Sequence, residues 1–588
     1  MPRAIFKLLI WVTSLGTLGV ASDHPWTKVV SPHFTVLSES GEGSARKVAV
    51  QFEQIRSVLM QIIPGLSTDP STPLLVVAVP DQPASESLVG ALNKRVSGMF
   101  LPGRDYNYAI VLLDSTKEWL DHTVVHEYVH LLTRVNIGSL PTWVNEGIAD
   151  FYGQSDLSGE RVKFGQPIVR YAEFVRERGM IPYSRLFVLT NRSPEYNSDS
   201  TIPMVYAESW AIVHYLLLGD NGAHSQQLGE YISLLQQGKS SLSAAKQAFG
   251  DPDKLQDAVV RHMRQFSLPF RWVNLPREDF SKQLTATTMS LAETESWRAS
   301  IVANHDVARG KALAEAAVAA EPGLAPAHET LALVSLKEGD YSNAKGEFEK
   351  ALALDPSLYL SNYYHAILLL RDRGDAAVAE AELRKATASN PNYAPALLAL
   401  ARLLAARPDS LKDALKFGWQ AVQHEKMRVG YHLAFGYMLL RAGKAEQAEL
   451  AAKHASDMYA DAVEKSEATR LLELAQRCQA KRDCGPQMQI APLTPSDIED
   501  DATTDLERTV GTIVEARCSK GERRVKIDTA DGKLDLALLA NTGVDAPDTF
   551  WVGPEYFNCA ALVGETAMVT KRKQPDAQLV RLEVLERF

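Results

Sequence analysis

The sequence has no long basic run, few cysteines and, beyond its first 22 residues, no long apolar stretch. Its formal net charge of −10 over 588 residues argues against a nucleic-acid-binding surface. No later segment is apolar for long enough to cross a bilayer as a helix. The cysteines have neither the spacing nor the histidine neighbours of a metal site. If the protein is exported, the simplest of their three possible pairings joins Cys478 to Cys484 and Cys518 to Cys559.

The start of the chain has the features of a secretory signal. Arg3 and Lys7 give a positive start, Leu8–Val20 form a short apolar core, and Gly19–Ser22 offer small residues for cleavage. We therefore predict a cleaved signal peptide and an exported protein, either periplasmic or secreted. An uncleaved anchor is the alternative.

The run His126-Glu127-Tyr128-Val129-His130 carries the clearest chemistry. Two histidines four residues apart lie on the same face of a helix. This spacing lets both imidazoles reach one tetrahedral metal ion, and Glu127 then sits beside the open position of the metal. Ser115 and Glu118 have the spacing of a capping box, so we expect the helix to begin near them.

His122 also lies four residues before His126, but it is eight residues from His130. On a helix this separation is about 12 Å along the axis, too far for those two imidazoles to share one ion. We therefore interpret His122 as a histidine near the cleft that does not bind the metal.

A third ligand is expected from the next segment, which runs from Pro141 to Asp150. Pro141 suits the first turn of a second helix, on which Glu146 and Asp150 are one turn apart and share a face. Glu146 would complete a His-His-Glu zinc site. Asp150 could accept a hydrogen bond from the other nitrogen of a ligand histidine and so fix its orientation.

Together, the His-Glu-x-x-His motif and the segment Trp143-Val144-Asn145-Glu146-Gly147-Ile148-Ala149-Asp150 resemble the gluzincin metallopeptidases, the peptidase MA-like branch related to thermolysin and the aminopeptidases. The resemblance covers residues 30–270 and rests chiefly on residues 122–153. The interval between His130 and Glu146 is shorter than in thermolysin, which bears on substrate specificity more than on the metal.

The resemblance implies a Zn²⁺ ion bound by His126, His130 and Glu146, with Glu127 as general base and Asp150 supporting a ligand. It also implies an edge strand that pairs with the substrate backbone, which we place near Gly98 and Met99. An ordinary structural strand is the alternative there. In aminopeptidase-type relatives a downstream tyrosine stabilises the oxyanion. Tyr206 is the best-placed candidate, with Tyr215 and His214 behind it, although a tyrosine packed in a helix face is an equal alternative.

The rest of the chain divides by composition. Strand-like runs and one helix precede the zinc motif, and helices follow it. Alanine-rich helices then recur with prolines 34 and 35 residues apart, at Pro322, Pro356 and Pro391, a pattern that resembles the tetratricopeptide repeat. The C-terminal part has short strand-like runs and Asp531-Gly532 as a hairpin turn, which favour a small β-barrel, SH3-like or OB-like.

We therefore predict a multidomain α+β protein that combines a gluzincin-like catalytic domain of mixed sheet plus helices, a helical repeat solenoid and a small β-barrel-like domain. The predicted boundaries are a signal peptide over 1–22, the α/β part of the catalytic domain over 23–115, its helical zinc-binding part over 116–290, the repeats over 295–478, an acidic, proline-containing linker over 479–507 and the β domain over 508–588.

The leading functional hypothesis is an exported zinc peptidase whose repeats bind a protein or peptide. The second is a binding protein in which the peptidase-like domain is inactive and the repeats scaffold a complex of the cell envelope. The third keeps zinc hydrolysis but acts on a non-peptide amide or ester. A rigid spacer that binds nothing is the alternative for the repeats.

Overall fold

The structure is a computed structural model, which describes most of the chain from His24 to Lys481 and the strands beyond it. The described residues are 24–63, 65–90, 98–101, 103, 105–113, 122–138, 140–155, 161–177, 181–189, 193, 195, 198, 200–237, 239–274, 278–372, 374–458, 462–481, 485, 506–519, 522–529, 532–537, 543–545, 566–572 and 579–585. The predicted signal peptide, the capping box at Ser115 and Glu118, and most of the predicted linker lie outside them.

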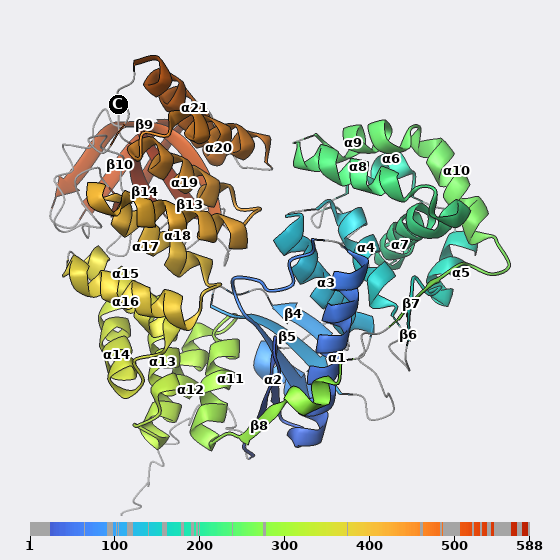
Figure 1. Ribbon diagram of the computed structural model, residues 1–588, viewed down its shortest axis with the longest axis horizontal. Helices are drawn as coiled ribbons and strands as arrows, with labels where there is room; N and C mark the ends of the chain where they lie inside the picture. Colours follow the sequence, from blue (N-terminus) through green and yellow to red (C-terminus); the bar gives the residue numbers. More distant parts are fainter. Residues whose placement is uncertain are drawn as a thin grey trace, which may run out of the picture.

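A six-stranded sheet forms the centre of the first half of the molecule (Figure 1). Its order is β4-β5-β3-β2-β1-β8, and β2, β3 and β5 run parallel to one another, whereas the other pairs are antiparallel. The strands are β1 (Thr27–Val30), β2 (Thr35–Ser38), β3 (Leu74–Val79), β4 (Gly98–Leu101), β5 (Asn107–Leu112) and β8 (Thr285–Thr288). The sequence did not signal β8, which returns from far along the chain to pair with β1.

Successive side chains of β3 alternate between two hydrophobic cores, as strand geometry requires. Val76 and Ala78 face the core that holds α1 (Gly41–Ile62) and the helices of the zinc motif. Val77 and Val79 face a second core, which holds Leu88 of α2 (Gln82–Val89) and Ile301 of α11 (Leu291–Val302). Because α11 also begins the repeats, the repeat array is built directly onto the sheet.

Helices follow the sheet on the side of the first core. They are α3 (His122–Asn136), α4 (Thr142–Gly153), α5 (Val169–Glu177), α6 (Tyr183–Leu186), α7 (Ile202–Leu218), α8 (Ser225–Gln236), α9 (Ser241–Phe249) and α10 (Pro252–Met263), with a small antiparallel pair, β6 (Arg161–Phe164) and β7 (Arg271–Asn274). In the part of the chain that the structure describes, no helix combines the length and the apolarity needed to cross a membrane.

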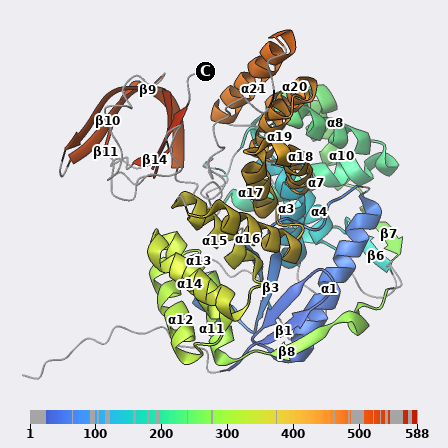
Figure 2. The ribbon, with the colours of Figure 1, turned by 60° about the vertical axis from the view of Figure 1, so that its left-hand side comes forward.

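The predicted tetratricopeptide-like repeats form consecutive helix pairs, each helix packed on the next (Figure 2). After α11 they are α12 (Val307–Ala320), α13 (Ala325–Glu338), α14 (Tyr341–Leu354), α15 (Tyr359–Arg371), α16 (Ala376–Ser389), α17 (Ala394–Ala405), α18 (Leu411–His424), α19 (Val429–Arg441), α20 (Ala445–Asp457) and α21 (Ala462–Lys481). The alanines that carry the period, Ala344, Ala379, Ala351 and Ala386, are all fully buried, which lets paired helices approach closely.

The described C-terminal strands form one sheet in the order β11-β10-β9-β13-β14-β12, and the closure of the predicted small β-barrel is not found among them. They are β9 (Leu506–Ser519), β10 (Glu522–Thr529), β11 (Gly532–Ala537), β12 (Gly543–Asp545), β13 (Thr566–Arg572) and β14 (Leu579–Leu585). The long β9 pairs with both β10 and β13, so that among the described strands β11 and β12 lie at opposite edges. Cys478 is disulfide-bonded, while its predicted partner Cys484 lies outside the described residues.

Candidate metal centre

Helix α3 presents its histidines on one side because its other side is anchored in the core. Val125, Tyr128 and Val129 are buried there. The Tyr128 ring lies edge-on to Phe34 and Phe52, with both pairs of ring centroids 5.8 Å apart. Such aromatic pairs fix the rotation of a helix as well as its depth. The histidines of the motif lie on the adjacent side of the helix.

Helix α4 supplies the carboxylates. Pro141 immediately precedes it, so the expected helix is present with its start shifted by one residue. Gly147 brings the helix against α7: a Cβ at this position would lie 2.4 Å from the carbonyl oxygen of Ser209 and 2.7 Å from Val213. Only glycine allows this approach. It turns the neighbouring Glu146, which is buried, toward α3.

Three predicted ligands meet at one point. The Nε2 atoms of His126 and His130 are 2.9 Å apart, and Glu146 Oε2 is 3.4 Å from the first and 3.5 Å from the second. A tetrahedron with metal–ligand bonds of ~2.0–2.1 Å has edges of about 3.3 Å. The three donor atoms therefore have the mutual spacing of zinc ligands, and two nitrogens with one carboxylate oxygen are a donor set that zinc accepts.

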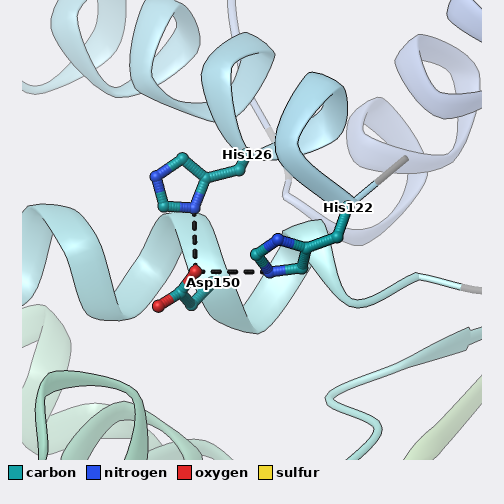
Figure 3. A group of neighbouring side chains, drawn as sticks. All are labelled: His122, His126 and Asp150. Carbon is teal, nitrogen blue, oxygen red and sulfur yellow. Dashed lines mark hydrogen bonds and ion pairs between the residues drawn. The ribbon is translucent and has the colours of Figure 1, made fainter. Parts of the chain in front are cut away.

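Asp150 joins two histidines of α3 (Figure 3). Its Oδ1 atom lies 2.9 Å from His126 Nδ1 and 3.2 Å from His122 Nε2. His126 thus turns one ring nitrogen to Asp150 and the other to Glu146 and His130. Gly153 makes room for His122, because a Cβ there would lie 3.1 Å from His122 Nε2. His122, His126 and Asp150 also form a second group of possible donors, which competes with the first for His126.

The charges around the metal centre favour ionised carboxylates. Burial alone would raise the pKa of Glu146, but its interactions with His126 and His130 outweigh burial and lower that pKa to about 2. The pKa of Asp150 is also lowered, because His122 and His126 overcome the cost of burial. Two buried negative charges beside neutral imidazoles would be costly unless a cation balanced them.

The pKa values of His126 and Glu127 shift upward. Burial disfavours the charged imidazole of His126, yet Asp150 and Glu146 raise its pKa to about 10. The two carboxylates thus favour a positive charge between them. Burial also raises the pKa of Glu127, although the neighbouring His126 and His130 act in the opposite direction. A carboxyl whose pKa is moved toward neutrality is suited to exchange protons.

Two further predicted residues lie on α7. Tyr206 lies half-buried on α7 and packs against the same core as α3, and its role stays a prediction. His214 is fully buried, with its ring 3.0 Å from His262 and 3.1 Å from the carbonyl of Gly165, which marks it as a residue of the core.

Tyr171 was missed by sequence reasoning. Burial raises its pKa most, and the negative charges of Asp150 and Glu146 raise it further, while Arg170 acts in the opposite direction. It belongs to α5, beyond β6, and no motif marks it. Only the folded arrangement of α5 against α7 could reveal it.

Strand β4 is an edge of the sheet and packs beside α3, which holds the histidines. Its pairing with β5 is antiparallel and matches Met99 with Ile110. An edge strand has unpaired backbone groups on its outer side that can bind an extended peptide. The strand for which the resemblance implied substrate pairing therefore occupies a position compatible with it.

Comparisons with known proteins give one family match and several similar structures. Residues 121–237, which run from α3 to α8, match a family described as "Protein of unknown function (DUF1570)". No curated protein matches. Solved structures similar to this chain include YrrB, "a TPR protein with an unusual peptide-binding site", with 20% identity over 30% of this chain and 93% of that chain at a TM-score of 0.26.

Two further solved structures are similar over comparable shares of the chain. MamA has 14% identity over 33% of this chain and 98% of that chain, at a TM-score of 0.23. TTC0263, a thermophilic TPR protein of Thermus thermophilus, has 18% identity over 32% of this chain and 99% of that chain, at a TM-score of 0.25.

Proposed function

We propose that this chain is a zinc-dependent hydrolase that cleaves peptide bonds. The observation that supports the proposal most is the convergence of His126, His130 and Glu146 with donor separations of 2.9, 3.4 and 3.5 Å. Two histidines on α3 and a glutamate on the next helix, α4, are the ligands that the resemblance to gluzincins implied. The features of residues 1–22 support an exported enzyme.

Each residue of the centre has a distinct role in this proposal. His126, His130 and Glu146 would hold the zinc ion, and Asp150 would keep the His126 ring in the orientation that directs Nε2 to the ligand set. Zinc, when bound, polarises a carbonyl group and activates water. Glu127 would accept a proton from the attacking water and deliver it to the leaving amine. The outer side of β4 would align an extended substrate.

The repeats support a second candidate function, a scaffold that acts without catalysis. They present exposed apolar side chains, among them Trp419 and Leu450 with exposed fractions of 51% and 66%. Helix-pair arrays of this kind provide extended surfaces for proteins or peptides. An intact ligand set together with Glu127 favours the enzyme, because a pseudoenzyme has no need to keep all four residues.

The test compares the wild-type protein with Glu127→Gln after both are loaded with zinc. We expect both to bind one equivalent of metal by elemental analysis, because Glu127 is not a ligand. The wild type should cleave members of a peptide library, and a chelator should stop it. Glu127→Gln should be slower by about 10²–10⁴-fold, the contribution typical of a general base.

Three outcomes separate the hypotheses. Cleavage of peptides that is sensitive to chelator and to Glu127→Gln supports the peptidase. Hydrolysis of amide or ester compounds with no peptide cleavage would replace the substrate class. Zinc-loaded wild type that cleaves neither class would favour the scaffold.

A further inference from the structure

The turn between β4 and β5 is held by the repeats rather than by the sheet alone. Asp105, in this turn, is buried and accepts a hydrogen bond from the hydroxyl of Tyr364 on α15, 259 residues later in the chain. Tyr364 has an exposed fraction of 2%. A buried hydrogen bond from a hydroxyl to a carboxylate is stronger than an ordinary hydrogen bond between neutral groups.

Tyr106 extends the same contact through packing. It packs against the core of the repeats and against the second core of the sheet, which holds Leu88 and Ile301, so it joins the two. Its ring lies edge-on to Trp297 of α11, with centroids 5.4 Å apart. At the start of β5, the hydroxyl of Tyr108 lies 2.7 Å from Ser300 Oγ, also on α11. Asp105 thus contacts α15, and Tyr106 and Tyr108 contact α11.

This attachment bears on the edge strand beside the metal centre. β4 pairs only with β5 among the described strands, in a register that matches Leu101 with Tyr108. An edge strand is held by one neighbouring strand only, and β5 is itself paired with β3 on its other side. The position of β4 therefore depends on β5 and on the chain that joins the two strands, where Asp105, Tyr106 and Tyr108 contact the repeats.

We propose that Asp105 and Tyr364 are positioning residues, through which the repeat array holds β4 in place for substrate binding beside the zinc ligands. This inference rests on the proposed function and deepens it. The repeats then serve the active site through an internal contact, and the part of α11 and α15 that faces the turn is already engaged by the chain itself. Repeats that only recruit substrate would not need this contact.

The test removes the hydroxyl in Tyr364→Phe and follows hydrogen–deuterium exchange of the zinc-loaded full chain. Loss of this hydrogen bond should make amide exchange about tenfold faster at the described residues between 98 and 108. Asp105→Ala should have the same effect, whereas Asp105→Asn keeps an acceptor oxygen and should stay near wild type. Zinc content should not change in any of the three.

The chain offers a matched control in the last repeats. Tyr437 of α19 is equally buried, and its hydroxyl donates to Glu467 of α21. Tyr437→Phe therefore removes the same kind of bond from the same array without touching the turn. We expect unchanged exchange at β4 in this variant.

Peptide kinetics supply the functional half of the test. If β4 aligns the substrate, Tyr364→Phe should raise KM by about three- to tenfold with kcat nearly unchanged, the pattern of lost substrate binding. Exchange at β4 no faster than in Tyr437→Phe would overturn the inference, as would faster exchange with an unaltered KM. A wild type that cleaves no peptide would overturn the proposed function, while exchange would still decide whether Tyr364 holds the turn.

Discussion

Two groups of buried carboxylates in this molecule have opposite character. Between α3 and α4, Glu146 and Asp150 face imidazoles, and the pKa of Glu146 falls to about 2. Between α13 and α15, Glu329 accepts hydrogen bonds from the backbone N–H and the hydroxyl of Ser361, at 3.0 and 2.7 Å, and burial raises its pKa to about 7. Burial with neutral donors favours a protonated acid, whereas burial beside imidazoles keeps the acid charged.

The repeats also contain histidine–carboxylate pairs. Comparing these pairs with the metal centre shows that the centre differs by having a third possible donor. His328 lies 2.6 Å from Glu347, and His365 lies 2.9 Å from Glu382. Within the described part of the chain, groups of three possible metal donors occur only around His126. A histidine–carboxylate pair offers only two donor atoms, whereas three converging donors can hold a metal ion.

The largest effect that would test this difference is expected for His130→Ala. It removes one of three ligands, and since even the partners of ligands change metal affinity by 10–100-fold, we expect zinc affinity to fall by more than about 100-fold. Competition with a chromogenic chelator measures it. The control is His365→Ala, which breaks the histidine–glutamate pair with Glu382 in the repeats and should leave zinc binding unchanged. Equal zinc binding by both variants would remove the distinction between the two regions.

A smaller loss is expected for Asp150→Asn, which keeps an acceptor oxygen but removes the negative charge beside His126. We expect zinc affinity to fall by about 10–100-fold, the range for groups that orient a ligand. His122→Ala should have a weaker effect in the same direction, because His122 contacts Asp150 and not the ligand set. If His122→Ala proved more damaging than His130→Ala, the second donor group would be the true metal site.

Gly147→Ala tests how much the close contact between α4 and α7 contributes to the stability of the protein. The added Cβ would collide with the backbone of Ser209, and crowding of this kind costs about 1–3 kcal/mol. Urea unfolding of the two proteins measures the loss. Gly229 on α8 has open space where a methyl group would be added, so Gly229→Ala should instead stabilise the protein by about 0.5–1 kcal/mol.

The sequence predicts local features better than long-range ones, for physical reasons. The four-residue spacing of His126 and His130 and the buried run Leu74–Val79 are visible because helices and strands repeat over a few residues. The return of β8 to β1 and the bond between Tyr364 and Asp105 join residues hundreds of positions apart, and no local pattern encodes them. The described C-terminal strands form the predicted β domain without closing a barrel, because short strands predict a sheet but not its closure.

Glu329→Gln tests the other side of the comparison, and its effect should depend on pH. Because the folded protein holds a proton on Glu329 that the unfolded chain releases near pH 4.5, its contribution to stability is present below pH 4.5 and is lost as pH rises through about 7. The pKa difference corresponds to at most about 3 kcal/mol. Glutamine stays neutral and keeps an acceptor for Ser361, so this part of the pH dependence should disappear.

Urea midpoints at pH 5 and pH 8 measure this effect for wild type, Glu329→Gln and Glu446→Gln, the last a change at an exposed glutamate of α20. Relative to wild type, Glu329→Gln should gain stability at pH 8 and gain little at pH 5, and Glu446→Gln should follow the wild type at both. An identical pH dependence in Glu329→Gln and wild type would mean that Glu329 is already charged when buried. The repeats and the metal centre would then share one kind of buried acid, and the ionised state of Glu146 and Asp150 would no longer single out α3 and α4 as a cation site.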